Sequence, residues 1–158
     1  MPRIAVIPGD GIGREVLDEG LKVLRHLDKQ EELGLEYELL NYGADRFLTD
    51  GIAITDEEMT SLGEDYDAIF LGALGDPRVP SNEHAGKILL GMRFQLDLYI
   101  NLRPVKLLDS RYCPLKDKSP EDMRFVVFRE NTEGLYTGIG GQFKKGTPDE
   151  VSIQAELN

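Results

Sequence analysis

The sequence has a single cysteine, two histidines and no long apolar run. Cys113 cannot form a disulfide within the chain, and without a second thiol it cannot build a cysteine-based zinc site. His26 lies in an amphipathic stretch and His84 in a loop-like segment, so they have neither the spacing of a metal-binding pair nor an obvious catalytic partner. We expect both histidines to be structural or surface residues, and we assign no metal ligand.

The apolar runs are too short for a membrane protein, because none approaches the roughly 20 residues that span a bilayer. The first residues, MPRIAVIPGD, also lack the long apolar core of a secretory signal. The hydrophobic fraction of 41% is nevertheless enough for one ordinary domain with a buried core. These features predict a soluble, cytoplasmic globular protein with no membrane partner.

Positive charge is scarce, with 18 Lys and Arg residues against 29 Asp and Glu residues and a formal net charge of −11. Such a chain repels a phosphate backbone and offers no basic stripe, so we expect no nucleic-acid partner. A small anionic substrate meets the same mean repulsion. It has to be captured by a local cluster of arginines, whose forked guanidinium binds a carboxylate through two parallel hydrogen bonds.

Strands and helices alternate along the first half of the chain. Short runs rich in Ile, Val and Leu predict strands, and apolar residues at three- and four-residue spacing predict helices. The predicted strands span residues 3–7, 35–40 and 67–75, and the predicted helices span 13–28 and 55–63. The strand at 67–75 is apolar enough to be buried on both faces. This order predicts a largely parallel sheet flanked by helices.

The chain changes character after residue 75. A loop rich in turn residues, 75–82, precedes a short helix that carries Ile88 and Met92 and ends near Arg93. We place a domain boundary before Pro104, which gives residues 1–103 to a larger α/β domain and residues 104–158 to a second, smaller domain.

Strand-like runs follow from residue 98 onward and alternate with turns that carry Gly or Pro, which favours antiparallel pairing. These runs are residues 98–108, 124–129 and 151–157. The glycine-rich stretch 135–148 predicts a hairpin or an extended arm.

The turn Gly9-x-Gly11-x-Gly13 joins the first strand to the first helix, whose amino-terminal N–H groups could face an anion. Its spacing differs from Gly-x-Gly-x-x-Gly, and no acidic residue at the end of a second strand is clearly placed to hold a ribose. The glycines could equally serve only a tight strand-to-helix turn. Both interpretations stay open on spacing alone.

Three arginines are candidate anion-binding residues: Arg93, Arg103 and Arg129. Two of them lie in or beside apolar strand-like segments, where an unpaired guanidinium is costly to bury. Converging on one site, they would suit a dicarboxylate or tricarboxylate. Pairing with internal acids such as Asp97 or Glu130 is the alternative, and the excess of acids favours it when only the residues are considered.

Tyr136 follows Arg129 by seven residues. A phenol placed among arginines can donate a hydrogen bond or a proton, whereas a tyrosine of the core or of an interface is the alternative.

Four segments, in this order, resemble the isocitrate/isopropylmalate dehydrogenase family: IAVIPGDGIG at 4–13, GALG at 72–75, DLYINLRP at 97–104 and RENTEGLY at 129–136. The resemblance covers the chain nearly end to end and looks closest to 3-isopropylmalate and tartrate dehydrogenases. It implies an isopropylmalate dehydrogenase-like α/β fold, of which this chain is the amino-terminal part and in which residues 104–158 begin the smaller, dimer-forming domain.

The resemblance also implies an NAD-dependent, β-decarboxylating oxidoreductase of leucine biosynthesis that works as a homodimer. Its substrate would be a 2-hydroxy di- or tricarboxylic acid such as 3-isopropylmalate. The alternatives are a tartrate- or malate-type enzyme, or a non-catalytic fragment that acts through association with another chain. Gly86 stands where isopropylmalate enzymes usually present an acid to the nicotinamide ribose, which keeps the tartrate- or malate-type alternative open.

By this resemblance, Arg93, Arg103 and Arg129 hold the substrate carboxylates, and Tyr136 assists protonation of the enol left after carbon dioxide departs. Hydride passes to NAD, whose nicotinamide half would lie beside a set of residues from three segments: Ile12, Gly75, Asp76, Pro77, Ala85 and Gly86.

A divalent Mg²⁺ or Mn²⁺ is implied as well, chelating the substrate hydroxyl and carboxylate and stabilising the enolate. Residues 151–158 look like the middle of a strand. We therefore expect the family's catalytic lysine, metal-binding aspartates and adenosine-binding loop downstream of Asn158, and we expect this chain alone to be inactive.

Overall fold

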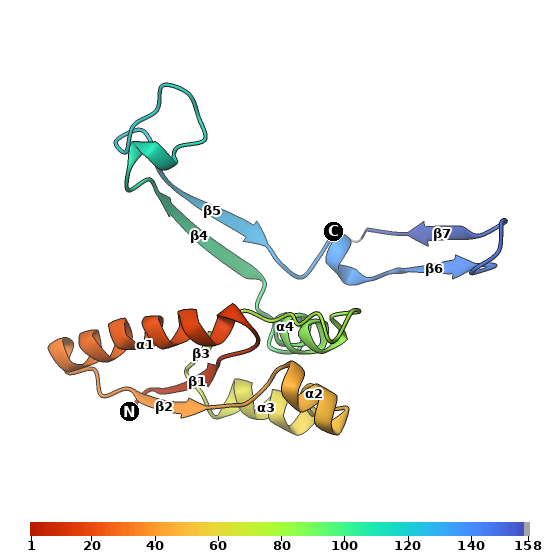
Figure 1. The fold of residues 1–158 in the computed structure, drawn as a ribbon, viewed down its shortest axis with the longest axis horizontal. Coiled ribbons are helices and arrows are strands. Elements are labelled where there is room, and N and C mark those ends of the chain that lie inside the picture. The colour runs from red at the N-terminus through yellow and green to blue at the C-terminus, as the bar shows by residue number, and fades with distance from the viewer. Residues whose placement is uncertain (157–158) are drawn as a thin grey trace. The chain divides into compact units, whose positions relative to one another are not determined.

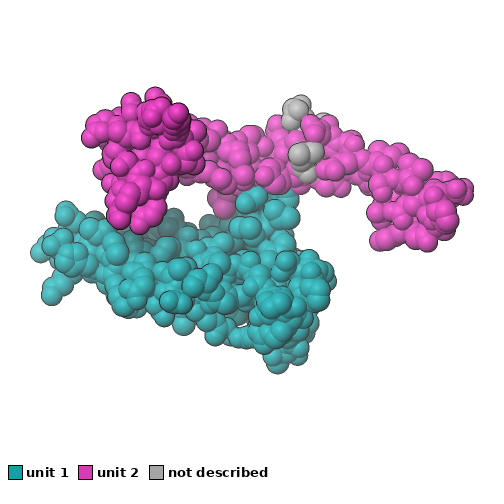
Figure 2. Space-filling model, turned by 45° about the horizontal axis from the view of Figure 1, so that its top comes forward, with its two compact units in different colours: residues 1–96 teal, residues 97–158 magenta. Residues whose placement is uncertain are grey.

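A computed structural model describes residues 1–156 (Figure 1). The chain divides into two compact units, Met1–Leu96 and Asp97–Asn158, called the first and second unit below (Figure 2). The division precedes the boundary expected before Pro104, because that proline lies in the middle of strand β4 (Ile100–Lys106). A strand that pairs along its whole length belongs to one unit.

The first unit is built on a parallel sheet of three strands in the order β2-β1-β3. The strands are β1 (Arg3–Ile7), β2 (Glu36–Leu39) and β3 (Ala68–Leu71). The predicted parallel sheet is therefore confirmed, and β1 has the predicted bounds, whereas β2 and β3 are shorter than predicted. The prediction that β3 is buried on both faces is wrong, because its residues are only half-buried or exposed.

Helices cover both faces of this sheet, because successive side chains of β1 point to opposite sides. On one face Val6 packs with two leucines of α1 (Ile12–Glu31). On the other face Ala5 and Ile7 join a core with residues of α3 (Asp56–Glu64) and α4 (Glu83–Gln95). Figure 1 shows α1 and α3 on opposite sides of β1. No helix within residues 1–156 is long and apolar enough to cross a bilayer.

The two helices between β2 and β3 begin in different ways. Helix α3 begins at a reciprocal cap, in which the Thr55 side chain accepts from the Glu58 N–H and the Glu58 carboxylate accepts from the Thr55 N–H. Helix α2 (Ala44–Asp50), which the sequence did not predict, begins after Gly43 without a side-chain cap.

The second unit consists of two antiparallel ribbons. In the first, β4 pairs with β5 (Arg124–Glu130), and in the second, β6 (Gly140–Phe143) pairs with β7 (Val151–Gln154). The stretch 135–148, expected to form a hairpin or an extended arm, supplies the first strand and the turn of this second ribbon, whose other strand lies beyond it at 151–154. Short 3₁₀ turns lie at η1 (Ser110–Tyr112) and η2 (Leu135–Thr137). Strand β7 ends before the predicted limit of 157, a position outside the described residues.

Candidate active site

The glycine turn after β1 is held against the end of β3. The Asp10 N–H donates to the Ala73 carbonyl oxygen at 2.7 Å. A Cβ on Gly9 would lie 2.1 Å from that same oxygen, and a Cβ on Gly13 would lie 2.5 Å from the Pro8 carbonyl oxygen. Gly9 also has a φ of 70°. Close approach of two backbone segments therefore requires glycine at both positions, which supports the tight-turn interpretation.

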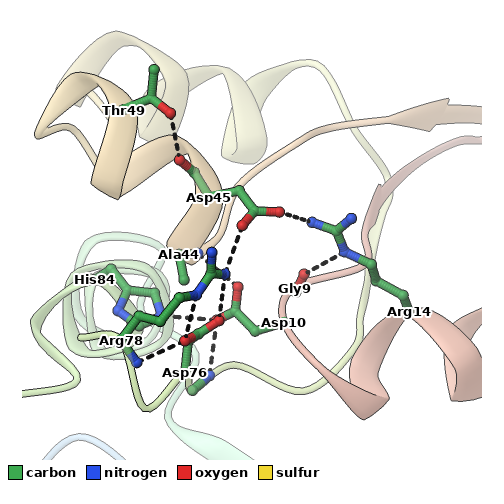
Figure 3. Close-up of polar contacts among 10 residues, drawn as sticks. Gly9, Asp10, Arg14, Ala44, Asp45, Thr49, Asp76, Arg78 and His84 are labelled. Carbon is green, nitrogen blue, oxygen red and sulfur yellow. Dashed lines mark hydrogen bonds and ion pairs between the residues drawn. The ribbon is translucent and has the colours of Figure 1, made fainter. Parts of the chain in front are cut away.

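Asp10 is the centre of a buried polar network that joins three segments (Figure 3). Its carboxylate accepts from the Ala44 N–H at 2.6 Å, from the Gly75 N–H at 2.9 Å and from His84 Nε2 at 2.8 Å. Its side chain is 3% exposed and that of His84 is fully buried. Burial acts to raise the pKa of Asp10, but the hydrogen bonds from Ala44, Gly75 and His84 together lower it below its ordinary value. An ionised carboxylate thus ties the glycine turn to α2, to the 75–82 loop and to α4.

His84 was expected in a loop, but it lies in the first turn of α4, where it stacks on Phe47 with ring centroids 5.9 Å apart. Facing an ionised acceptor, its Nε2 carries the proton. The expectation of a structural role fits this burial. The part that Asp10 plays was not predicted, because its partners lie 34 to 74 residues away in the sequence.

A set of ion pairs, most of whose side chains are half-exposed, lies beside this buried centre (Figure 3). Asp45 of α2 pairs with Arg14 of α1 and with Arg78 of the 75–82 loop, both at 2.7 Å. Arg78 also pairs with Asp76, and its hydrogen bonds lower the pKa of Asp76 to about 2. The side chain of Asp76 is therefore fixed within its own loop and ionised at neutral pH.

The residues predicted to contact the cofactor lie in three places of the first unit. Gly75, Asp76 and Pro77 line a hollow of about 240 Å³ together with Val79, Pro80 and Asn82. Ile12 is the first residue of α1 and is 59% exposed. Ala85 and Gly86 lie in the first half of α4. Space is open beside Gly86, since a Cβ there would meet no atom within 4 Å. The hollow is smaller than most small-molecule sites, and its lining does not include Ile12, Ala85 or Gly86. The cofactor contacts therefore stay a prediction.

Arg103 and Arg129 lie on the same face of the β4–β5 ribbon. Asn101 is directly opposite Arg129 and Val127 is directly opposite Arg103, and residues two apart on a strand share a face. The Arg103 Nε donates to Asn101 Oδ1 at 2.8 Å, and an Arg129 Nη donates to Asn131 Oδ1 at 2.8 Å. Neither guanidinium has an ion pair with a carboxylate among residues 1–156.

The alternative that these two arginines pair with Asp97 or Glu130 is therefore wrong. Glu130 is opposite Ile100 and so lies on the other face of the ribbon. Its carboxylate instead accepts from the Thr132 hydroxyl and from the N–H groups of Thr132 and Glu133. These hydrogen bonds, that of the Thr132 side chain above all, lower the pKa of Glu130 to about 2.

Tyr136 lies in η2, and the Arg129 guanidinium carbon is 5.4 Å from the centre of its ring. The structure thus brings Arg129 and Tyr136 together. Arg93 lies in the last turn of α4, as expected, but it belongs to the first unit. The convergence of all three arginines stays a prediction.

A larger hollow, of about 530 Å³, follows β2 and contains none of the predicted site residues. Its arginine, Arg46, forms an ion pair with Glu58 at 2.9 Å, so its charge is already balanced. Burial, with a smaller contribution from Glu58, raises the pKa of Tyr42 there to about 12. We do not assign this hollow to an anionic substrate.

A divalent cation finds no ligand set in the part of the chain that is described. No group of three or more His, Cys, Asp or Glu side chains among residues 1–156 could hold a metal ion. We therefore assign no ligand of the predicted Mg²⁺ or Mn²⁺ to these residues.

The known proteins that this chain resembles in sequence belong to one family of dehydrogenases. Residues 3–157 match the family model described as isocitrate/isopropylmalate dehydrogenase. The 3-isopropylmalate dehydrogenase of Thermobifida fusca is 45% identical over 99% of this chain and 44% of its own length. That of Streptomyces griseus is 47% identical over 98% of this chain and 44% of its own length. The chain thus spans less than half the length of these relatives.

Solved structures agree. The isocitrate dehydrogenase of Methylococcus capsulatus matches with a TM-score of 0.74 at 27% identity, over 98% of this chain and 42% of that one. A β-decarboxylating dehydrogenase of Thermococcus kodakarensis matches with a TM-score of 0.64 at 32% identity, over 99% of this chain and 41% of that one.

Proposed function

The chain belongs to the isocitrate/isopropylmalate dehydrogenase family, and from that premise we propose that the protein carrying it performs NAD-dependent oxidative decarboxylation of 3-isopropylmalate. One observation carries the proposal. Arg103 and Arg129 share a ribbon face and are held by neutral amides, so both charges remain for an anionic ligand. The names of relatives that are 45 to 47% identical favour 3-isopropylmalate over tartrate, malate or isocitrate.

In this proposal Arg103 and Arg129, joined by Arg93, bind the two carboxylates of the substrate. Each guanidinium can give two parallel N–H bonds to one carboxylate, which fixes both the position and the orientation of the acid. Substrate binding of this kind breaks no ion pair within residues 1–156, because no carboxylate there has to be displaced from Arg103 or Arg129.

The cofactor would lie with its nicotinamide ring beside the 75–82 loop. Asp10 holds this loop through the Gly75 N–H, and α4 through His84. The proposed contacts are the residues expected from the sequence: Ile12, Gly75, Asp76, Pro77, Ala85 and Gly86. Bound NAD supplies the hydride acceptor for oxidation of the substrate alcohol.

Oxidation of the alcohol to a ketone places one substrate carboxylate β to the new carbonyl. The bond to that carboxylate then breaks, carbon dioxide leaves, and the electron pair remains on the substrate as an enolate. We assign to Tyr136 the delivery of a proton to the carbon of that enolate, since its ring lies beside the Arg129 guanidinium. We assign no residue of this chain as the base that removes the alcohol proton.

The remaining parts of the proposal concern the whole protein. We propose a cytoplasmic homodimer in which the second unit, which starts at Asp97 and contains the expected residues 104–158, begins the dimer-forming domain. We also propose a requirement for Mg²⁺ or Mn²⁺ bound by residues that this chain does not supply.

The test is NADH formation by the complete gene product with 3-isopropylmalate, tartrate, malate or isocitrate, each with and without Mg²⁺ or Mn²⁺. We expect turnover with 3-isopropylmalate and a loss of it on chelation of the metal. Turnover with only one of the other three acids would show that this acid, and not 3-isopropylmalate, is the substrate. No NADH formation with any of the four acids would overturn the proposed function.

A further inference from the structure

We propose that Asn101 and Asn131 are positioning residues that orient the guanidiniums of Arg103 and Arg129 while leaving their charge available to the substrate. This inference rests on the proposed function and extends it to residues that do not themselves carry charge. Its basis is the hydrogen-bond chain that runs from Arg103 through Asn101 and Asn131 to Arg129.

The orientation of both amides is set by their partners. Arg103 Nε and Arg129 Nη can only donate, so the amide atom facing each of them is the carbonyl oxygen. The Asn131 Nδ2 in turn donates to the Leu98 carbonyl oxygen at 3.3 Å, and the Asn101 Nδ2 donates to Asn131 Oδ1 at 3.4 Å. Asn131 is 5% exposed and Asn101 is half-buried. The amides thus form an ordered support rather than loose surface contacts.

The neutrality of this support distinguishes it from the arginine partners elsewhere in the chain. Within residues 1–156, several other arginines have a carboxylate within ion-pair distance, among them Arg3, Arg14, Arg46, Arg78 and Arg111. A carboxylate at position 101 or 131 would make a stronger, charge-assisted hydrogen bond to its arginine. It would also cancel the positive charge that a substrate carboxylate needs, in a chain of net charge −11.

The guanidiniums also keep unused donors. Arg129 uses one Nη in the amide chain, while its buried Nε has no hydrogen-bond partner within residues 1–156. Arg103 uses only its Nε in the part of the chain that the structure describes. The terminal nitrogens of Arg103 therefore remain to bind a ligand. This is expected if Asn101 orients the guanidinium without using all of its hydrogen-bond donors.

The experiment compares Asn101→Asp with Asn101→Ala in the complete gene product. Aspartate keeps an acceptor for Arg103 Nε, loses only the long hydrogen bond to Asn131, and adds a negative charge between the two arginines. Alanine removes both hydrogen bonds and adds no charge. A structural role for Asn101 predicts that alanine is the more harmful change, whereas the proposed role predicts the opposite for substrate binding.

We expect Asn101→Asp to raise the KM for 3-isopropylmalate by at least about tenfold, the cost of neutralising one charge-assisted contact. We expect a smaller rise for Asn101→Ala, an unchanged KM for NAD in both variants, and a melting temperature of Asn101→Asp equal to or above that of the wild type.

Three results would decide against the inference. Equal KM values for the two variants, or a larger rise for alanine, would show that the amide acts only as a structural support. Failure of Asn101→Asp to fold would show that a carboxylate cannot take the place of the amide, which the inference requires. The two KM results presuppose an active wild type, whereas the folding result does not. An inactive wild type would overturn the proposed function, and this inference with it.

Discussion

Replacing Asp10 with alanine should destabilise the first unit more than any change in its exposed ion pairs. Three donors lose their acceptor: the N–H groups of Ala44 and Gly75 and the Nε2–H of His84. A buried donor left without a partner costs roughly 1–3 kcal/mol, so the low end for all three is about 3 kcal/mol. That is a large part of the roughly 5–15 kcal/mol that stabilises a typical domain.

Thermal unfolding of the 158-residue chain, followed by circular dichroism, measures this loss. At this size a loss of about 3 kcal/mol lowers the melting temperature by about 6–12 °C. Asp45→Ala is the matched control, because Asp45 belongs to the same cluster but its two ion pairs are half-exposed. Equal melting temperatures for Asp10→Ala and Asp45→Ala would refute the role of Asp10 as the buried acceptor of three segments.

The pH dependence gives a second test. The pKa of Asp10 is lowered in the folded state, so its contribution to the free energy of unfolding is complete above the ordinary aspartate pKa of about 3.9. The contribution is lost as the pH falls through the lowered folded-state value. The difference in urea midpoint between the wild type and Asp10→Asn should therefore be constant near neutral pH and shrink in acid. A difference that does not change with pH would contradict an ionised Asp10.

Four further changes test other parts of the structure. Gly13→Ala should destabilise by at least about 1–3 kcal/mol, because its Cβ would meet backbone atoms at 2.5–2.6 Å; an unchanged melting temperature would disprove the close approach. Thr55→Ala should cost about 1 kcal/mol in urea unfolding through loss of the α3 cap, and no loss would show that the cap is dispensable. In the complete gene product, Arg103→Ala should lower kcat/KM for 3-isopropylmalate about 10- to 150-fold, so an unchanged value would remove it from the site. Tyr136→Phe should lower kcat more than it raises KM, and wild-type kinetics would make the hydroxyl structural.

The elements that the sequence predicted well are those set by local pattern. The apolar run of β1 and the three- and four-residue spacing in α1 identify both elements, because each pattern directly reflects which side is buried. Helix α2 was not predicted because it lacks such a local pattern. It has seven residues, only one of them buried, and it follows a glycine without a side-chain cap, so neither periodicity nor capping signals it.

The candidate site was predictable only in part. The family motifs pointed to Arg103, Arg129 and Tyr136, and the structure brings Arg129 and Tyr136 together. The residues alone favoured pairing of the arginines with internal acids. Composition cannot tell that Glu130 faces the other side of the ribbon, because this follows from the register of β4 with β5. The amide partners Asn101 and Asn131 could not be predicted either, because their contacts with the two arginines also depend on how β4 pairs with β5.

The buried carboxylate of Asp10 also determines how the first unit can move. A loop normally opens at its own rate, governed by the few bonds that hold it. Here the start of α2, the 75–82 loop and the start of α4 share one acceptor, so none of them can swing outward without leaving a charge buried among fewer partners. Their fluctuations should be correlated and rare. A proposed cofactor loop fastened in this way is rigid before any ligand arrives, and little conformational entropy remains to be lost when one binds.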